Sequence, residues 1–233
     1  MNQKIALVTG ANRGIGLEVC RQLLAKDCIV ILSSRNTEKG KQAVQSLGGS
    51  TSKLHYHQLD TTDEESIQRI KVYIENTFGR LDILINNAAI NYDIWHTALT
   101  VDLVQAHQTI EANLFGPWKM CQTFIPLMQK MGYGRVVNVS SISGSLATMN
   151  ADAPAYSMSK AALNVLTIQL AKLVPDTDIL VNAIGPGWVK TDMGTSKAPR
   201  TVEEGAAGII WAATLPKGSP TGGFFRDEQR LAW

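Results

Sequence analysis

The sequence has no apolar run of the roughly 18 residues that a membrane-crossing helix needs, and no secretory signal at its start. Its three cysteines, Cys20, Cys28 and Cys121, are odd in number and widely spaced, which fits a reducing compartment without disulfides. Neither sign of charge dominates, because 22 Lys and Arg residues face 20 Asp and Glu residues. We therefore expect a cytoplasmic protein with no general attraction to nucleic acid or to a membrane.

Repeats, low-complexity tracts and linkers rich in Pro, Gly and Ser are also missing, so nothing divides the chain. Its 233 residues suffice to bury a core of their own. A hydrophobic content of 45% with 18% charged residues is ordinary for a globular protein and argues against disorder. We expect one domain that spans residues 1–233.

The spacing of hydrophobic residues changes repeatedly along the chain. Nearly continuous apolar runs predict strands of a parallel sheet covered on both faces, at residues 5–9, 28–33, 53–59, 82–86, 135–140 and 179–184. Stretches with a helical period lie between or after them, at residues 14–26, 37–47, 63–78, 101–131, 155–174 and 202–215. This alternation predicts an α/β, single-domain Rossmann fold, with a doubly wound parallel sheet of about seven strands. Ligands of such sheets bind at the carboxyl ends of the strands.

Local signals mark some of the helix boundaries. Thr62 with Glu65, and Thr201 with Glu204, have the spacing of capping boxes at the starts of the third and last predicted helices. Pro117 lies inside the longest predicted helix, where it either kinks the helix or occupies a first turn.

A glycine-rich turn follows the first predicted strand. Residues 9–16 read Thr-Gly-Ala-Asn-Arg-Gly-Ile-Gly, and the next helix begins within them. Glycines let the backbone turn sharply and approach a ligand, and the free N–H groups and dipole of a helix N-terminus attract an anion. This context favours a pyrophosphate site over a merely tight turn. The candidate contacts are Gly10, Asn12, Arg13, Gly14, Ile15 and Gly16.

The end of the second predicted strand indicates which nucleotide binds. An acidic residue there usually holds the ribose hydroxyls of NAD, whereas residues 32–36 read Leu-Ser-Ser-Arg-Asn. Arg35 is placed to pair with a 2′-phosphate, and Arg13 is a second candidate cation. One such contact is worth roughly 1.5–3 kcal/mol, which favours NADP(H) by roughly ten- to a hundredfold. The alternative is that Arg35 is a solvated loop cation.

Tyr156 and Lys160 lie four residues apart in a predicted helix, which places the phenol and the ammonium on one helix face. A free tyrosine titrates at about pH 10, and a nearby cation lowers the pKa of a phenol. A drop of about three units, roughly 4 kcal/mol, would let Tyr156 exchange a proton near neutral pH. By itself the pair is a weak signal, because any helix face can carry one.

Six ordered matches together resemble the short-chain dehydrogenase/reductase family, in its compact single-domain branch. They run from residue 9 to residue 191, so the resemblance covers essentially the whole chain. The matches are residues 9–16, Asn86-Asn87-Ala88, Asn113 in Asn-Leu-Phe-Gly, Ser140-Ser141, Tyr156 to Lys160, and residues 186–191. Residues 186–193 and 222–227 look most like the carbonyl-reductase-like members.

The resemblance implies a role for each matched residue. Tyr156 would give a proton to the substrate carbonyl oxygen, Lys160 would lower the pKa of Tyr156, and Ser141 would hold the carbonyl oxygen. Asn113 would support a water relay that ends at Lys160. The implied cofactor contacts are Asp60 at the adenine, Asn87 and Ala88 in the groove, Tyr156, Lys160 at the nicotinamide ribose, Pro186, Gly187, and Val189 and Thr191 at the nicotinamide amide.

The sequence departs from the family pattern at two places. Ala89 stands where the family usually has glycine, and its Cβ is expected to crowd the cofactor or change the local backbone. The interval from Ser141 to Tyr156 is slightly longer than usual, which leaves Ser143 as an alternative. Ser141 is preferred because it is the second serine after the strand. Asp60 also fits a turn or cap residue.

We expect an oxidoreductase that uses NADPH to reduce an aldehyde or ketone to an alcohol by hydride transfer, with tyrosine as general acid and no metal. Trp95, Met149, Trp188 and Met193 either pack in the core or line an apolar substrate pocket under a lid at residues 191–200. Some carbonyl-reductase-like proteins carry a long insertion before the tyrosine. This chain lacks it, which puts their substrates in doubt here.

Two other functions stay open. A non-catalytic NADP(H)-sensing protein would bind the cofactor without turnover. The intact set of proton-transfer residues argues against it, because a sensor need not keep them. A nucleotide-binding methyltransferase would usually need an acidic residue after the second strand. The expected partner is a small-molecule carbonyl compound. Family members are often homodimers or homotetramers through helices that correspond to residues 101–131 and 155–174, although these faces could equally be buried within one chain.

Overall fold

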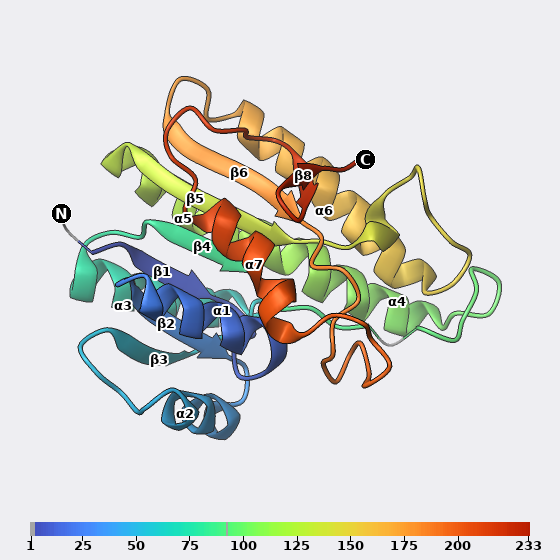
Figure 1. Ribbon diagram of the computed structural model, residues 1–233, viewed down its shortest axis with the longest axis horizontal. Coiled ribbons are helices and arrows are strands. Elements are labelled where there is room, and N and C mark those ends of the chain that lie inside the picture. Colours follow the sequence, from blue (N-terminus) through green and yellow to red (C-terminus); the bar gives the residue numbers. More distant parts are fainter. Residues whose placement is uncertain (1–2, 92) are drawn as a thin grey trace.

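A computed structural model describes residues 3–91 and 93–233 of the chain. One twisted sheet separates two groups of helices (Figure 1). In chain order the elements are β1 Ile5–Val8, α1 Gly14–Ala25, β2 Ile29–Ser34, α2 Thr37–Ser46, β3 Leu54–Gln58, α3 Glu64–Phe78, β4 Ile83–Asn86, α4 Leu103–Ile110, η1 Glu111–Phe115, α5 Gly116–Met131, β5 Tyr133–Val139, η2 Ile142–Gly144, α6 Pro154–Lys172, β6 Asp178–Ile184, α7 Val202–Ala213, β7 Phe224–Arg226 and β8 Gln229–Arg230.

The sheet has the order β3-β2-β1-β4-β5-β6-β7-β8, and every pair is parallel except β7 with β8. The predicted doubly wound Rossmann fold is therefore confirmed. Its eighth strand was not predicted; Asp227 and Glu228, with φ of 51° and 65°, form the tight turn that adds this short antiparallel edge. The strand order reverses between β1 and β4, which places the ligand crevice at their carboxyl ends.

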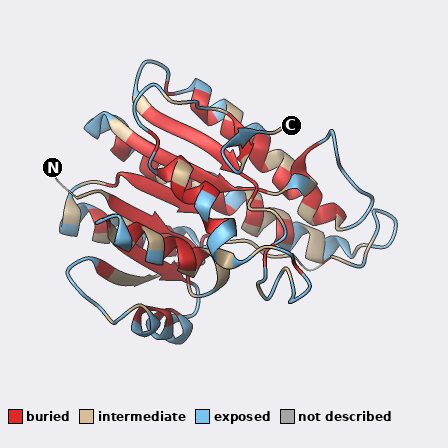
Figure 2. Cartoon of the chain, in the orientation of Figure 1, coloured by how far each residue is buried: buried red, intermediate tan, exposed pale blue. Residues whose placement is uncertain are grey.

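Each face of the sheet buries its own hydrophobic core. Residues of α1, α2 and α7 pack on one face, and residues of α3, α5 and α6 pack on the other. Figure 2 shows that most of the sheet between them is buried. Burial on both faces explains why the strands are nearly continuous apolar runs. Among the helices of the described residues, none is long and apolar enough to span a bilayer.

The two capping predictions have different outcomes. The Thr201 hydroxyl accepts from the Glu204 amide at 3.3 Å and the Glu204 carboxylate accepts from the Thr201 amide at 2.8 Å, which confirms the capping box. The prediction at Thr62 is wrong, because Asp63 caps α3 by accepting from the Glu65 amide at 3.0 Å. The Thr62 hydroxyl instead donates to the carboxylate two residues before it.

The helix predicted over residues 101–131 is not a uniform α-helix. A π-helical turn, η1, separates α4 from α5 and contains Asn113. Hydrophobic periodicity does not distinguish such a turn from the α-helix around it, and π-turns occur frequently at functional sites. Pro117 lies in the first turn of α5, which is one of the two predicted positions.

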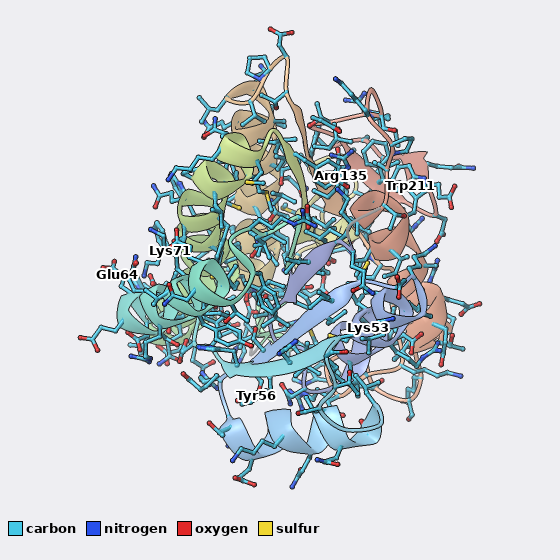
Figure 3. The ribbon with its side chains drawn as sticks, turned by 90° about the vertical axis from the view of Figure 1, so that its left-hand side faces the viewer. Lys53, Tyr56, Glu64, Lys71, Arg135 and Trp211 are labelled. Carbon is cyan, nitrogen blue, oxygen red and sulfur yellow. The ribbon has the colours of Figure 1, made fainter. Side chains whose placement is uncertain are left out.

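A buried arginine lies at the end of the sheet opposite to the ligand crevice. Arg135, near the start of β5, is only 1% exposed, and Figure 3 labels it in the interior. Its guanidinium donates to the carbonyl oxygens of Leu215, Gly134 and Asp178 at 2.7 Å each, and to the Asp178 carboxylate at 2.8 Å. These bonds satisfy the buried charge. They also fix β5 and β6, whose other ends carry predicted site residues.

Candidate active site

The glycine turn between β1 and α1 has the shape of an anion cradle. Gly10 and Gly14 have φ of 62° and 55°, a conformation that favours glycine. A Cβ built on Gly10 would lie 2.8 Å from the backbone Cα of Ala88, so the turn sits directly against the end of β4. α1 begins at Gly14 with no side-chain cap and no acidic residue in its first turn, which leaves its N-terminus suited to an anion.

Asn87 and Thr9 hold this turn in place. The Asn87 side chain donates to the carbonyl oxygens of Thr9 at 2.8 Å and Gly10 at 3.1 Å. The Thr9 hydroxyl accepts from the backbone amides of Asn87 and Ala88, both at 3.0 Å. The predicted groove residues Asn87 and Ala88 therefore lie against the phosphate loop. Ala89 is not among the described residues with a positive φ, and its predicted effect on the cofactor or on the local backbone stays a prediction.

Two other predicted contacts of the glycine turn, Asn12 and Ile15, are partly buried, as are Gly10 and Gly14. Asn12 is half-buried, and Ile15 packs against the core beneath α1. A Cβ on Gly16 would meet the Asn87 amide nitrogen at 2.5 Å, so this glycine permits the close packing of helix on loop.

Arg35 lies at the wall of a cavity of about 780 Å³ next to the end of β2. The lining also includes Thr62 and Ile90, from the loops after β3 and β4, and, from α4 and η1, residues 106–108, 110–112 and 115. Sequence reasoning missed these lining residues, because helical periodicity does not say which face of a helix meets a cleft. Asp60, the predicted adenine contact, accepts at one oxygen from the Thr62 amide at 3.0 Å and hydroxyl at 2.7 Å, so it also shapes the turn.

Arg13, the second candidate cation, points elsewhere. It forms an exposed ion pair with Asp192, which belongs to the predicted lid. A Cβ on Gly14 would lie 3.1 Å from the Thr191 methyl group, so the glycine turn and the segment after β6 are adjacent. The two candidate cations therefore lie in different surroundings. Arg35 lines the cavity, and Arg13 connects the glycine turn to the predicted lid.

Tyr156 and Ser141 come together from α6 and from the end of β5. A hydrogen bond with the Ser141 side chain lowers the pKa of Tyr156, but burial outweighs it and raises that pKa above its usual value. The Ser141 hydroxyl also accepts from the Ser143 amide at 3.2 Å. Of the two candidate serines, Ser141 is the one that contacts the phenol.

Lys160 is 2% exposed and lies one turn along α6 from Tyr156, with its Nζ 5.6 Å from the centre of the phenol ring. The ammonium donates to the Val139 carbonyl oxygen at 2.8 Å. Burial lowers the pKa of Lys160 to about 8. The pair therefore has the predicted spatial relationship. The predicted lowering of the phenol pKa is wrong for this structure, because burial raises the pKa of Tyr156. Stabilisation of the phenolate by Lys160 stays a prediction.

Asn113 is completely buried in the π-turn, and its side chain forms hydrogen bonds with two other segments of the chain. Its carbonyl oxygen accepts from the Ile90 amide, and its amide donates to the Ile90 carbonyl oxygen, both at 2.8 Å. It also donates to the Ser159 hydroxyl at 3.1 Å, and Ser159 in turn donates to the Tyr156 carbonyl oxygen at 2.7 Å. The side chain thus links η1, the loop after β4 and α6. The implied water relay stays a prediction.

The segment after β6 forms a closed loop at residues 188–200. The Lys190 amide donates to the Arg200 carbonyl oxygen at 2.9 Å, and the Arg200 amide donates to the Trp188 carbonyl oxygen at 3.3 Å. Of the predicted cofactor contacts here, Val189 is buried, whereas Pro186, Gly187 and Thr191 are half-buried. The four apolar residues singled out from the sequence are exposed rather than in the core: Trp95, Met149, Trp188 and Met193.

Comparison with known proteins connects this geometry to one family. The sequence profile of short chain dehydrogenases matches residues 4–201. The chain is 35% identical to (+)-neomenthol dehydrogenase of Arabidopsis thaliana, with 97% of each chain aligned. It is 33% identical to carbonyl reductase [NADPH] 3 of Mus musculus, with 99% of this chain and 98% of that protein aligned.

A solved structure shows the same fold. NADPH-bound carbonyl reductase from chicken fatty liver superimposes with a TM-score of 0.90 at 29% identity and full coverage of both chains. The alignment with the Arabidopsis protein spans 288 positions, more than the 233 residues of this chain, so that relative carries inserted residues. The phosphate loop, the Ser141–Tyr156 contact and these similarities agree. The chain belongs to the short-chain dehydrogenase/reductase family and is a carbonyl-reductase-like oxidoreductase suited to a nicotinamide cofactor.

Proposed function

We propose that the protein reduces an aldehyde or ketone to an alcohol with NADPH. The observation that carries this proposal is that the Ser141 hydroxyl and the buried ammonium of Lys160 both lie beside the phenol of Tyr156. These are the groups that carbonyl reduction requires, because the developing alkoxide needs a hydrogen-bond donor and then a proton. The bound cofactor supplies the hydride.

Each residue has a distinct task in this mechanism. The Ser141 hydroxyl donates a hydrogen bond to the substrate oxygen and orients it toward Tyr156. The Tyr156 phenol donates the proton to the same oxygen. A raised phenol pKa keeps Tyr156 protonated at neutral pH, as an acid must be, and the Lys160 ammonium favours the phenolate that remains. Asn113 keeps the helix of Tyr156 tied to the loop after β4.

The preference for NADP(H) rests on Arg35. Its exposed side chain lies at the cavity, and no carboxylate occupies residues 32–36, where NAD-binding folds usually place one. The cavity volume of about 780 Å³ is ample for an adenosine 2′-phosphate. Several related proteins are named as NADPH-dependent carbonyl reductases, which supports the same preference.

The substrate would have an apolar body. Met193 of the proposed lid, residues 191–200, and Trp188, which precedes the lid, are exposed, as are Ile142, Leu146 and Met149 in the loop after Ser141. Both loops follow strand ends on the side of the sheet where Tyr156 lies. Exposed apolar groups gathered near a polar centre are typical of a site for an apolar ligand with one polar function.

The direct test is turnover by the purified wild-type protein. With NADPH and a panel of apolar aldehydes and ketones, we expect one alcohol formed per NADPH oxidised. The same panel with NADH should give much slower turnover. If NADPH binds tightly but no carbonyl compound in the panel is reduced, the protein is a cofactor-binding sensor and the proposed function is wrong.

A further inference from the structure

The loop between β4 and α4 is fastened to the catalytic helix at successive points. At its start, Ile90 hydrogen-bonds Asn113 of η1, which in turn donates to Ser159 of α6. Further on, the Asp93 carboxylate binds the first turn of α6, and Thr97 pairs with Asp152 just before that helix. One loop that begins beside the phosphate cradle therefore also holds the start of the helix that carries Tyr156.

Asp93 is unusual among these contacts because its side chain is almost completely buried, at 1% exposure. Its Oδ2 accepts from the backbone amide of Ala155 at 2.6 Å. Its Oδ1 is buried too and has no hydrogen-bond partner among the described residues. Burying a carboxylate is unfavourable unless hydrogen bonds and a positive dipole compensate, and the helix N-terminus supplies both.

The helix needs this outside group because it lacks a cap of its own. The residue before its first turn, Ala153, has φ of 48° and no side chain that accepts a hydrogen bond. Pro154 has no amide hydrogen, so Ala155 offers the first amide of the helix. Asp93 thus acts as an N-cap residue although it lies in a distant segment of the chain. The amide that it binds belongs to Ala155, the residue immediately before Tyr156.

We propose that Asp93 is a positioning residue for the general acid, which rests on the proposed function. By fixing the Ala155 amide, Asp93 sets the angle at which the first turn of α6 presents the Tyr156 hydroxyl to Ser141. Among the described residues, its side-chain hydrogen bond goes to Ala155 and not to the glycine turn or Arg35. Its removal therefore reduces turnover while cofactor binding persists, because a shift of about 1 Å in a reacting group costs about a hundredfold in rate.

Asp93→Ala, Asp93→Asn and Asp102→Ala separate this role from general stability. Asp102 is the matched control, because it lies in the same loop and caps α4 by accepting from Val104 N–H at 2.9 Å, but it is exposed. We expect Asp93→Ala to lower kcat by about 30-fold or more with KM for NADPH within about twofold. Asp93→Asn keeps an acceptor oxygen and should stay within about threefold of wild type, as should Asp102→Ala.

Hydrogen exchange at the Ala155 amide provides a readout that does not depend on activity. Asp93→Ala should accelerate exchange at Ala155 by at least about tenfold, whereas Asp102→Ala should not change it. Full turnover in Asp93→Ala, or loss of turnover in Asp93→Asn equal to that in Asp93→Ala, overturns the positioning role. If Asp93→Ala does not fold, the test uses Asp93→Asn alone, and a large loss of turnover in that variant overturns the positioning role. A wild-type protein without carbonyl reduction contradicts the proposed function, while exchange still decides whether Asp93 caps α6.

Discussion

The Nζ of Lys160 lies 2.8 Å from the carbonyl oxygen of Val139, the last residue of β5. This hydrogen bond joins α6 to the strand whose end leads into Ser141. Because the lysine is buried at the junction, its protonation and the geometry of the proposed site are coupled. Burial lowers the pKa of Lys160 to about 8, which places a titration within the accessible pH range.

The first prediction concerns pH. Lys160 is charged below pH 8 and loses its proton above it, whereas Tyr156, whose pKa is raised, stays protonated throughout this range. We expect kcat/KM for carbonyl reduction to be constant from about pH 6 to 7.5 and to fall above about pH 8 by up to about tenfold per unit. Initial rates at saturating NADPH in constant ionic strength give the profile. A constant rate up to about pH 9.5 would show that the ammonium is not required.

The second prediction separates the two arginines. Arg35→Ala should reduce the ratio of kcat/KM with NADPH to that with NADH by about ten- to a hundredfold, since it removes one charge-assisted contact with a phosphate. Arg13→Ala is the matched control, because its guanidinium already pairs with Asp192. Its effect on the ratio should be less than about threefold. Equal effects of the two substitutions would refute the assignment of the 2′-phosphate to Arg35.

The third prediction tests the phosphate cradle. Gly10→Ala places a Cβ 2.8 Å from a backbone atom of Ala88, in a turn with φ of 62°. Gly79→Ala is its control: φ is 69° there, but nothing lies within 4 Å of the added Cβ. Each substitution should cost about 1–2 kcal/mol of stability from backbone strain. Only Gly10→Ala should also weaken NADPH binding, by about tenfold or more, in a fluorescence titration. Similar affinities in the two variants would contradict the cradle.

The fourth prediction distinguishes the two serines. Ser141→Ala removes the hydroxyl beside Tyr156 and should lower kcat by about a hundredfold, as expected for the loss of a hydrogen bond to a developing oxyanion. Ser143 binds Ser141 through its backbone amide, and Ser143→Ala keeps that amide. Its kcat should remain within about threefold of wild type. The reverse ranking, measured at saturating substrate, would transfer the role to Ser143.

Local sequence signals predicted much of the site, and tertiary contacts account for the rest. The glycine turn, the Tyr156–Lys160 spacing and the Thr201 cap depend on neighbours within a few residues, so the chain order alone reveals them. The π-turn at Asn113 and the cap supplied by Asp93 depend on which segments meet in space. Nothing in the residues around Asp93 indicates that it binds a helix that begins 61 residues later.

The wrong prediction of a cap at Thr62 is also explained by contacts that form only in the folded chain. Thr62, Asp63 and Asp60 are all suited to turns and caps, and the pattern alone does not decide among them. In the folded chain Asp60 engages Thr62, which leaves Asp63 to cap α3. The antiparallel edge formed by β8 is likewise too short to show a hydrophobic pattern, and only its pairing with β7 defines it.

Replacement of Tyr156 by phenylalanine tests the central claim most directly. The Tyr156→Phe variant should bind NADPH with near wild-type affinity and lose at least about a hundredfold in kcat, because general acid catalysis contributes about 10²–10⁴-fold. Tyr133→Phe, at the opposite end of β5, is the matched control and should keep full turnover. Undiminished kcat in Tyr156→Phe would show that this phenol does not protonate the substrate.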